Sequence, residues 1–270
     1  MSRLCRVLGV STSGYYAWRK RPASAHRQYD LKLQEVMREV HQGHRRSYGA
    51  ARLHRELVRN GHGCSRRRVN RLMREMGIKA ATTGLYAWRP GQHALYSSTG
   101  NRLGGAERPT GPNQQWVGDF TYIKTRTGWL YHAVVLDLFN RKVVGWSFSR
   151  RRNAELTRSA LRMALSRHQP APGCLFHSDQ GIEYAAHEYR DLAESAGLVR
   201  SMSRKGNPLD NAVAESFFHT LKAELVRKHR FDHVIEAVAK IVEYIEFYNR
   251  ERLHSSLGYR TPEEYGQACA

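Results

Sequence analysis

Cysteine is scarce in this 270-residue chain, and its four cysteines do not form pairs. Cys5, Cys64, Cys174 and Cys269 lie far apart without a CxxC spacing, which argues against a disulfide scaffold and favours a reducing compartment. Long apolar runs and a signal-peptide pattern are also missing. We therefore expect a soluble intracellular protein with no membrane partner. Histidines near Cys64 leave a zinc site open as an alternative, although no paired ligand spacing supports it.

Acidic residues are in the minority, with 24 Asp and Glu against 44 Lys and Arg, and the net charge is +20. The imbalance is concentrated at one end: residues 1–110 carry 22 basic and 6 acidic residues, whereas residues 111–270 carry 22 and 18. Because the basic residues fall on helical patterns, the N-terminal region is predicted to bind a polyanion, with nucleic acid as the candidate. The alternative is a solvated, highly charged surface.

Helical periodicity dominates residues 1–80. Residues 2–20 predict two short helices around a turn, either a helix-turn-helix or an ordinary helical hairpin. A helix over residues 28–42 precedes a stronger helix-turn-helix, in which Ser65 caps a second helix that stops at Gly77. This second helix begins with three arginines, and recognition helices present their N-terminal side chains to bases and phosphates. The predicted DNA contacts are Arg66, Arg67, Arg68 and Arg71; the alternative is a surface helix with scattered charge.

Periodicity is lost over residues 81–112, where Gly, Ser, Thr and Pro predict a linker. From residue 113 to 270 the pattern is of mixed type. Alternating runs predict an antiparallel meander of three strands over Gln115–Lys124, Gly128–Leu138 and Lys142–Ser149. Short strands over 174–178 and 198–203 then alternate with helices over 154–167, 186–196, 211–226 and 233–252. The predicted fold class is α/β, with a mixed five-stranded sheet flanked by helices after an all-α region.

Three carboxylates occupy distinct positions in this predicted fold. Asp119 lies in the first strand, Asp179 follows the 174–178 strand, and Glu215 lies in a helix, with 35 residues between it and Asp179. If the 174–178 strand lies beside a central Asp119 strand, the two aspartates converge and the helix brings Glu215 across. Mg²⁺ prefers oxygen ligands, and two such ions can activate an attacking oxygen and stabilise a leaving one. The pattern predicts a two-metal site for phosphoryl transfer on DNA.

Other polar residues near these acids have weaker patterns. Glu215, His219 and Lys222 share one helix face, which suits a ligand, a donor and a phosphate clamp, or else a solvated polar stripe. Asp137 is expected to have a hydrogen-bonded structural role, and Asp210 to cap a helix. No reason is evident for Glu183 and Glu224 to point inward.

Several motifs together resemble one family. They are Trp116-Val-Gly-Asp119 within 112–123, residues 137–146, His177-Ser-Asp-Gln-Gly181, residues 206–216, and the 248–258 segment that contains Tyr248-Asn249 and His254-Ser-Ser-Leu. With matching segments at 5–18 and 48–77, the chain resembles the orfB-type transposases of the IS-three family of bacterial insertion sequences. More distantly it is similar to retroviral integrases, which share an Asp-Asp-35-Glu pattern.

The resemblance implies an RNase H-like catalytic core in which Asp119, Asp179 and Glu215 hold two Mg²⁺ ions, with Mn²⁺ as a substitute. It implies cleavage at the ends of the element and transfer of the exposed 3′-hydroxyl to another phosphodiester. Residues expected to grip the DNA backbone are Arg204, Lys205, Lys222, Arg250, Arg252 and His254. The expected partners are double-stranded DNA (the terminal repeats and the target), further copies of the chain on DNA, and an upstream-frame partner or fusion.

Two alternatives to this function remain open. One is a DNA-binding regulator with a non-catalytic core, and the other is an RNase H-like nuclease that cuts without joining. The expected location is the bacterial cytoplasm, in association with the nucleoid.

Overall fold

The computed structural model describes residues 1–81, 103, 106–179, 181–203 and 211–268. The chain divides into two compact units. Unit 1 comprises Met1–Gly43 and Gly49–Lys79, and unit 2 comprises His44–Tyr48 and Ala80–Ala270. Most of the predicted linker over 81–112 lies outside the described residues.

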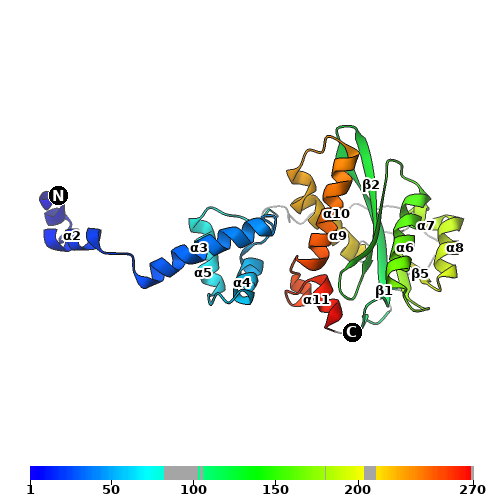
Figure 1. Cartoon of the computed structure of the whole chain (residues 1–270), viewed down its shortest axis with the longest axis horizontal. Coiled ribbons are helices and arrows are strands. Elements are labelled where there is room, and N and C mark those ends of the chain that lie inside the picture. The colour runs from blue at the N-terminus through cyan, green and yellow to red at the C-terminus, as the bar shows by residue number, and fades with distance from the viewer. Residues whose placement is uncertain (82–102, 104–105, 180, 204–210, 269–270) are drawn as a thin grey trace. The chain divides into compact units, whose positions relative to one another are not determined.

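Unit 1 consists of helices wherever it is described (Figure 1). The first two are α1 (Ser2–Val7) and α2 (Thr12–Lys20), followed by α3 (Ala25–Gly43), α4 (Ala50–Arg59) and α5 (Arg66–Glu75). The predicted cap of α5 is present, because the Ser65 hydroxyl accepts a hydrogen bond from the Arg68 amide. Apolar residues at helical spacing fill the space where α4 packs against α3 and α5. They are Leu33, Met37, Leu53, Leu57, Val69, Leu72 and Met73.

The segment His44–Tyr48 belongs to unit 2, although it lies between α3 and α4 in the sequence. Tyr48 is fully buried, and its hydroxyl donates to the carbonyl of Glu251 at 3.0 Å and accepts from the amide of Leu253 at 2.9 Å. The Lys228 ammonium donates to the carbonyl of Arg45 at 2.7 Å. These bonds hold the segment on the C-terminal part of unit 2, which is why a boundary drawn at residue 80 does not separate the two units fully.

Unit 2 is built on a mixed five-stranded sheet in the order β3-β2-β1-β4-β5. The antiparallel meander comprises β1 (Gln115–Thr125), β2 (Gly128–Asp137) and β3 (Val143–Ser149), and β4 (Leu175–Ser178) and β5 (Val199–Met202) continue the sheet in parallel. Each strand end lies within one residue of its predicted position. The central position of β1, with β4 beside it, is the arrangement that the two aspartates require.

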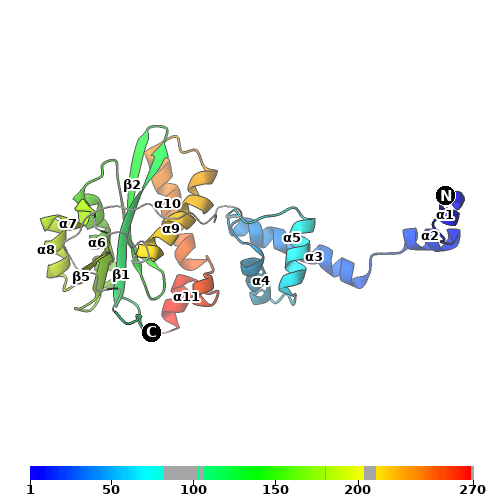
Figure 2. The ribbon, with the colours of Figure 1, turned by 180° about the vertical axis from the view of Figure 1, so that it is seen from behind.

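Helices cover both faces of this sheet (Figures 1 and 2). One side carries α6 (Ala154–His168), the short α7 (Ile182–Ala185) and α8 (His187–Ser195). The other carries α9 (Ala212–Glu224) and α10 (Val234–Arg250), with the turns η3 (Val226–Lys228) and η4 (Ser255–Leu257) and a final α11 (Pro262–Gln267). Neither α7 nor α11 was predicted. Across the described part of the chain, no helix combines the length and apolar character needed to cross a membrane.

Two apolar layers result from the alternation of side chains along the strands. Trp116 and Val117 are neighbours in β1, yet Trp116 packs in the layer beneath α6 and α8 and Val117 in the layer beneath α9 and α10. The first layer depends on a close approach at Gly145 of β3. A Cβ there would lie 2.3 Å from the carbonyl oxygen of Ala160, so only glycine lets β3 lie this near α6.

The free edge of β3 is partly satisfied by a side chain. The Asn249 carboxamide accepts from the amide of Val143 at 2.9 Å and donates to its carbonyl at 3.0 Å. This pair of bonds replaces a missing neighbouring strand, because an edge strand otherwise leaves such groups without a ladder partner. The Tyr248-Asn249 motif therefore has a structural role in joining α10 to the sheet.

Candidate active site and DNA-binding face

Asp119 lies at the point on β1 where pairing with β4 ends. The last aligned pair of these parallel strands is Gly118 with Ser178, so Asp119 and Asp179 are each the next residue along. Adjacent strands are about 4.8 Å apart, which brings the two backbones close at this point. Gly118 is required because a Cβ there would lie 2.5 Å from the ring of Phe176. The glycine of the Trp-Val-Gly-Asp motif thus lets β4 lie against β1 beside the acid.

Asp179 directly follows β4. Its carboxylate accepts a hydrogen bond from the amide of Gly181 at 3.0 Å. A Cβ at Gly181 would lie 2.9 Å from the same carboxylate and 2.8 Å from that of Glu183. A larger residue at position 181 would therefore crowd both carboxylates, so this position requires glycine.

Glu215 comes from the first turn of α9, on the sheet face to which Asp119 points. Alternation along β1 places Asp119 on the same side as Val117 and Ile123, which pack beneath α9 and α10. Asp119 and Asp179 are half-buried, whereas Glu215 is exposed. Lys222 follows on α9, is half-buried, and is close enough to Asp119 for their charges to interact.

The electrostatics of Asp119 link the three acids. Burial raises the pKa of the Asp119 carboxyl well above its usual range, the negative charges of Asp179 and Glu215 raise it further, and the Phe120 amide and the Lys222 ammonium oppose the rise. Burial likewise raises the pKa of Asp179 and of Glu215. The structure therefore brings Asp179 and Glu215 within electrostatic reach of Asp119, and their negative charges repel that of Asp119.

This repulsion makes the site suited to a cation. Carboxylate oxygens are the ligands that Mg²⁺ prefers, and an ion among them would relieve the repulsion that burial intensifies. Among the residues that the structure describes, no three His, Cys, Asp or Glu side chains form a ready-made metal cluster. The donor chemistry fits a divalent ion, although the carboxylates are not already gathered into a cage.

Three side chains around Asp179 were not anticipated. Glu183 is buried and forms an ion pair with Arg152, whose guanidinium also lies 5.0 Å from the ring centre of Phe120. The expectation that Glu183 has no reason to point inward is wrong, because Arg152, although exposed itself, supplies the buried carboxylate with a counter-charge. Tyr184 is also buried, and burial is the main cause that raises the pKa of its hydroxyl. The negative charges of Asp119 and Asp179 raise this pKa further. The sequence signal was the cluster of arginines that ends at Arg152.

Two other motif residues have structural contacts, which were expected for Asp137 and not for His177. Asp137 is buried, and its carboxylate accepts from the amides of Asn113 at 2.6 Å and Phe139 at 2.8 Å. His177 is also buried, and its two ring nitrogens bond the hydroxyls of Ser201 at 2.9 Å and Ser203 at 3.0 Å. The first residue holds the end of β2, and the second joins β4 to the segment of β5.

The residues of unit 2 that were predicted to contact the DNA backbone fall into three groups. Arg204 and Lys205 lie outside the described residues. Arg250 is exposed and pairs with Glu263 at 3.1 Å. The structure contradicts a direct DNA contact by Arg252, because its side chain is 3% exposed and donates to Glu224 at 2.8–3.2 Å. His254 is buried as well, with its ring 4.6 Å from that of Tyr248, so it offers no exposed grip either.

Glu224 also corrects an expectation. It is buried, accepts a hydrogen bond from the Tyr244 hydroxyl at 2.8 Å and pairs with Arg252. Glu224 points inward because Arg252, which lies 28 residues later in the sequence, supplies its counter-charge.

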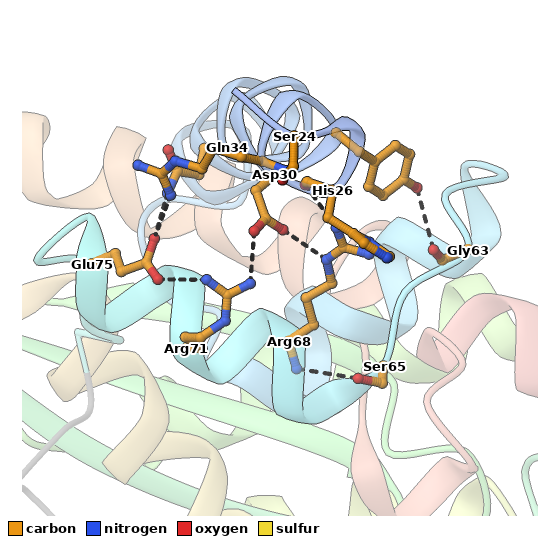
Figure 3. A network of polar contacts seen from close by, with 11 residues as sticks. Ser24, His26, Asp30, Gln34, Gly63, Ser65, Arg68, Arg71 and Glu75 are labelled. Carbon is orange, nitrogen blue, oxygen red and sulfur yellow. Dashed lines mark hydrogen bonds and ion pairs between the residues drawn. The ribbon is translucent and has the colours of Figure 1, made fainter. Parts of the chain in front are cut away.

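The four arginines predicted to contact DNA from α5 differ in their surroundings, and Figure 3 shows two of them, Arg68 and Arg71. Arg68 donates to one carboxylate oxygen of the buried Asp30 at 2.7 Å, and Arg71 donates to the other at 2.7 Å. Hydrogen bonds from Arg71 and Arg68 hold the pKa of Asp30 below its usual value, against the effect of burial. Arg66 and Arg67 are exposed, and within the described part of the chain neither forms an ion pair.

Comparison with known families matches most of the chain. Two integrase core domain models match residues 109–208 and 196–262, and an HTH-like domain model matches residues 28–84. The HTH-like match covers α3, α4 and α5, and the integrase matches cover the sheet and the helices on both faces.

Individual relatives extend over nearly the full length. The chain is 41% identical over 272 residues to the insertion element IS600 uncharacterized 31 kDa protein of Shigella sonnei, covering 99% of this chain and 100% of that protein. It is 38% identical to the transposase InsF for insertion sequence IS3A of Escherichia coli, covering 97% and 92%. A solved simian T-cell lymphotropic virus intasome in complex with a PP2A regulatory subunit shares the fold at a TM-score of 0.51 and 17% identity, covering 84% and 73%.

Proposed function

Because the chain belongs to the IS3-family transposases and has an RNase H-like integrase core, we propose that it cleaves DNA at insertion-sequence ends and transfers the exposed 3′-hydroxyl to a target phosphodiester. The observation that carries this proposal is the electrostatic contact of Asp119 with Asp179 and Glu215 at the junction of β1, β4 and α9. Three carboxylates from three separate elements, all with raised pKa values, indicate a site that functions with its negative charge neutralised.

The three carboxylates are the proposed ligands of two Mg²⁺ ions, for which Mn²⁺ can substitute. When bound, such ions supply Lewis-acid activation of the attacking oxygen and charge stabilisation for the leaving oxygen. Asp119 is positioned by β1, Asp179 by its bond from the Gly181 amide, and Glu215 by the first turn of α9. Asp119, Asp179 and Glu215 would hold such ions through their carboxylate oxygens, each supplied from a different part of the fold.

Other side chains would position the substrate and the acids. Lys222 is near Asp119, and its ammonium suits a non-bridging oxygen of the scissile phosphate. Arg152 is held by Glu183 and interacts with the charge of Asp179, so it limits the movement of the turn that carries this acid. Much of the rate enhancement would come from positioning and charge neutralisation, since the nucleophile is water and then a DNA hydroxyl.

Incubation of the full chain with a labelled element end and Mg²⁺ tests this function. We expect both a nicked strand and a joined product, and Glu215→Gln should reduce both by at least about 100-fold while end binding persists. Glu194→Gln is the matched control, because Glu194 is an exposed acid on α8, at the opposite face of the sheet. Nicking without joining would identify a nuclease, and binding without either product would identify a DNA-binding regulator. Wild-type turnover in Glu215→Gln would refute the assigned site.

We also propose that α5 of the HTH-like region binds the element DNA with the side chains of Arg66 and Arg67. Both are exposed at the N-terminal end of the helix, where recognition helices contact DNA. Arg68 and Arg71 would instead act through Asp30 by fixing α5 against α3. This division of roles changes the expectation that all four arginines contact DNA directly.

Joining the two ends of an element to a target requires that both ends be held together. We propose that copies of the chain assemble on DNA for this step, at the nucleoid, with the terminal repeats and the target as the double-stranded partners. The related solved structure is an intasome, which gives this expectation a precedent of the same fold.

A further inference from the structure

One face of the β1–β2 hairpin carries a strip of aromatic side chains, here called the aromatic strip: Phe120 and Tyr122 on β1, and Trp129 and Tyr131 on β2. Tyr122 is paired directly with Tyr131 in the antiparallel register, so their side chains lie on the same face. The rings of Tyr122 and Trp129 meet edge to face, with 5.4 Å between their centroids. Tyr122 is 57% exposed and Trp129 is 46% exposed, which is unusual for such large rings.

Cationic groups accompany three of the four rings. The Lys124 ammonium lies 6.0 Å from the ring centre of Trp129, and the Lys222 ammonium lies 5.4 Å from that of Tyr122. The guanidinium of Arg152 lies 5.0 Å from the ring centre of Phe120. The strip therefore combines flat apolar surfaces with positive charge, and its exposed end is formed by Tyr122 and Trp129.

The aromatic strip lies on the face of β1 opposite to that of Asp119, because side chains alternate along a strand. The two come together at one edge of β1: pairing with β4 ends at Gly118, and among the described residues no strand continues along this edge where Asp119 and Tyr122 lie. Lys222 connects the two, because its charge acts on Asp119 while its ammonium lies over the Tyr122 ring. A strand whose phosphate reaches Asp119 and that continues around this edge of β1 would meet the Tyr122 and Trp129 rings.

We propose that the aromatic strip is a stacking platform for unpaired nucleotides of the DNA strand next to the scissile phosphate. Proteins that bind single-stranded nucleic acid combine aromatic rings, on which bases stack, with cations that follow the backbone. An apolar protein partner would bury the Lys124 ammonium without supplying it a counter-charge, whereas a DNA strand supplies both bases and phosphates. The inference rests on the proposed function only in taking DNA as the polymer that reaches Asp119.

The test measures binding of a fluorescent oligo-dT to the full chain in EDTA, so that no cleavage contributes. The double variant Tyr122→Leu with Trp129→Leu keeps apolar volume but removes both exposed rings. Stacking contributes about 1–3 kcal/mol per base, so this variant should bind oligo-dT at least about 10-fold more weakly. Tyr122→Phe with Trp129→Phe retains two rings and should stay within roughly threefold of wild type.

A matched control is Ile235→Ala, which removes another exposed apolar side chain (79% exposed) from α10 and should leave oligo-dT binding unchanged. Equal binding by the Leu variant and wild type would overturn the proposal, as would an equal loss in the Phe and Leu variants. A Leu variant that binds oligo-dT normally but loses self-association in sedimentation would assign the strip to a second copy of the chain, which also overturns it.

Failure of this inference can be separated from failure of the proposed function. If the strip governs oligo-dT binding but no nicked or joined product forms, the strip stands and the catalytic proposal fails. If both products form normally with the Leu variant and its oligo-dT affinity is unchanged, the catalytic proposal stands and the strip has no role in DNA binding.

Discussion

Arg252 and Glu224 form a buried ion pair whose disruption should destabilise unit 2 strongly. Their side chains are 3% and 0% exposed, and three donor–acceptor distances of 2.8–3.2 Å join them. Glu224→Gln keeps the shape and still offers Tyr244 an acceptor, but it leaves the Arg252 charge buried without a counter-charge. Removing one member of a buried pair costs about 3–5 kcal/mol. For a unit of this size, that corresponds to a fall in Tm of roughly 6–20 °C.

The assay is thermal unfolding followed by circular dichroism, with an exposed ion pair as the control. Glu243 pairs with Arg45 at 2.6 Å, but Glu243 is 55% exposed, so Glu243→Gln should cost at most about 1 kcal/mol. Replacing the whole buried group by Glu224→Leu, Arg252→Met and Tyr244→Phe should recover most of the lost stability, because no polar group remains unpaired. Equal losses for Glu224→Gln and Glu243→Gln would refute the reasoning.

The same variants decide whether Arg252 contacts DNA. The triple variant should bind DNA with the salt dependence of wild type, because a side chain buried against Glu224 releases no counterions from phosphate. A fall of about 1 in the slope of log K against log salt would mean that Arg252 is a phosphate contact after all.

Three further predictions concern charge. Asp119→Asn should raise the Tm in EDTA by an amount that grows with pH. Burial raises the pKa of the Asp119 carboxyl in the folded chain, so this group stabilises the fold fully below its pKa in the unfolded chain. That stabilisation is lost as the pH rises through the pKa of the folded chain, whereas asparagine stays neutral. The stabilisation of wild type by Mg²⁺ should be absent from this variant, and a pH-independent difference would contradict this account. On α5, Arg67→Ala should lower the salt slope for element-end DNA by about 1. Asp30→Asn should leave that slope unchanged and lower the free energy of unfolding in urea by about 1–2 kcal/mol. A lower slope for Asp30→Asn, together with a loss of stability for Arg67→Ala, would contradict the assignment of DNA contact to Arg67 and of a structural role to Asp30. Burial lowers the pKa of His132 to about 4, so its contribution to stability is present above its unfolded value and is lost as pH falls toward 4. His132→Phe should remove roughly 3 kcal/mol of this acid dependence, and urea unfolding between pH 7 and 4 measures it.

Strand positions were predictable because they depend on local alternation. Runs such as Gln115–Thr125 place successive side chains on opposite faces, and both faces of this sheet are covered, so apolar residues continue along the strand. The short helices α7 and α11 were missed, because four or six residues are too few to establish a helical period. For α11 a local signal did exist: Thr261 and Glu264 form a capping box around Pro262.

The candidate site was less evenly predictable. Asp119, Asp179 and Glu215 were identified by their spacing and by the resemblance of the surrounding motifs, and the strand order explains how the first two approach each other. The environments of Glu183 and Glu224 were misjudged, because each buried carboxylate pairs with an arginine from a distant part of the sequence. Sequence reasoning considered those acids one at a time, whereas burial of a charge depends on the partner that neutralises it.

The sequence by itself determined the features that act over a few residues: the strand alternation, the cap at Ser65, the requirement for glycine near the acids, and the uneven distribution of charge. Only the tertiary structure decided which charges meet. Arg67 and Arg68 are neighbours with the same chemistry, yet Asp30, 38 residues before Arg68, holds one of them and leaves the other exposed. Electrostatic and hydrogen-bond energies depend on distance and burial in space, so identical residues acquire different roles once the chain has folded.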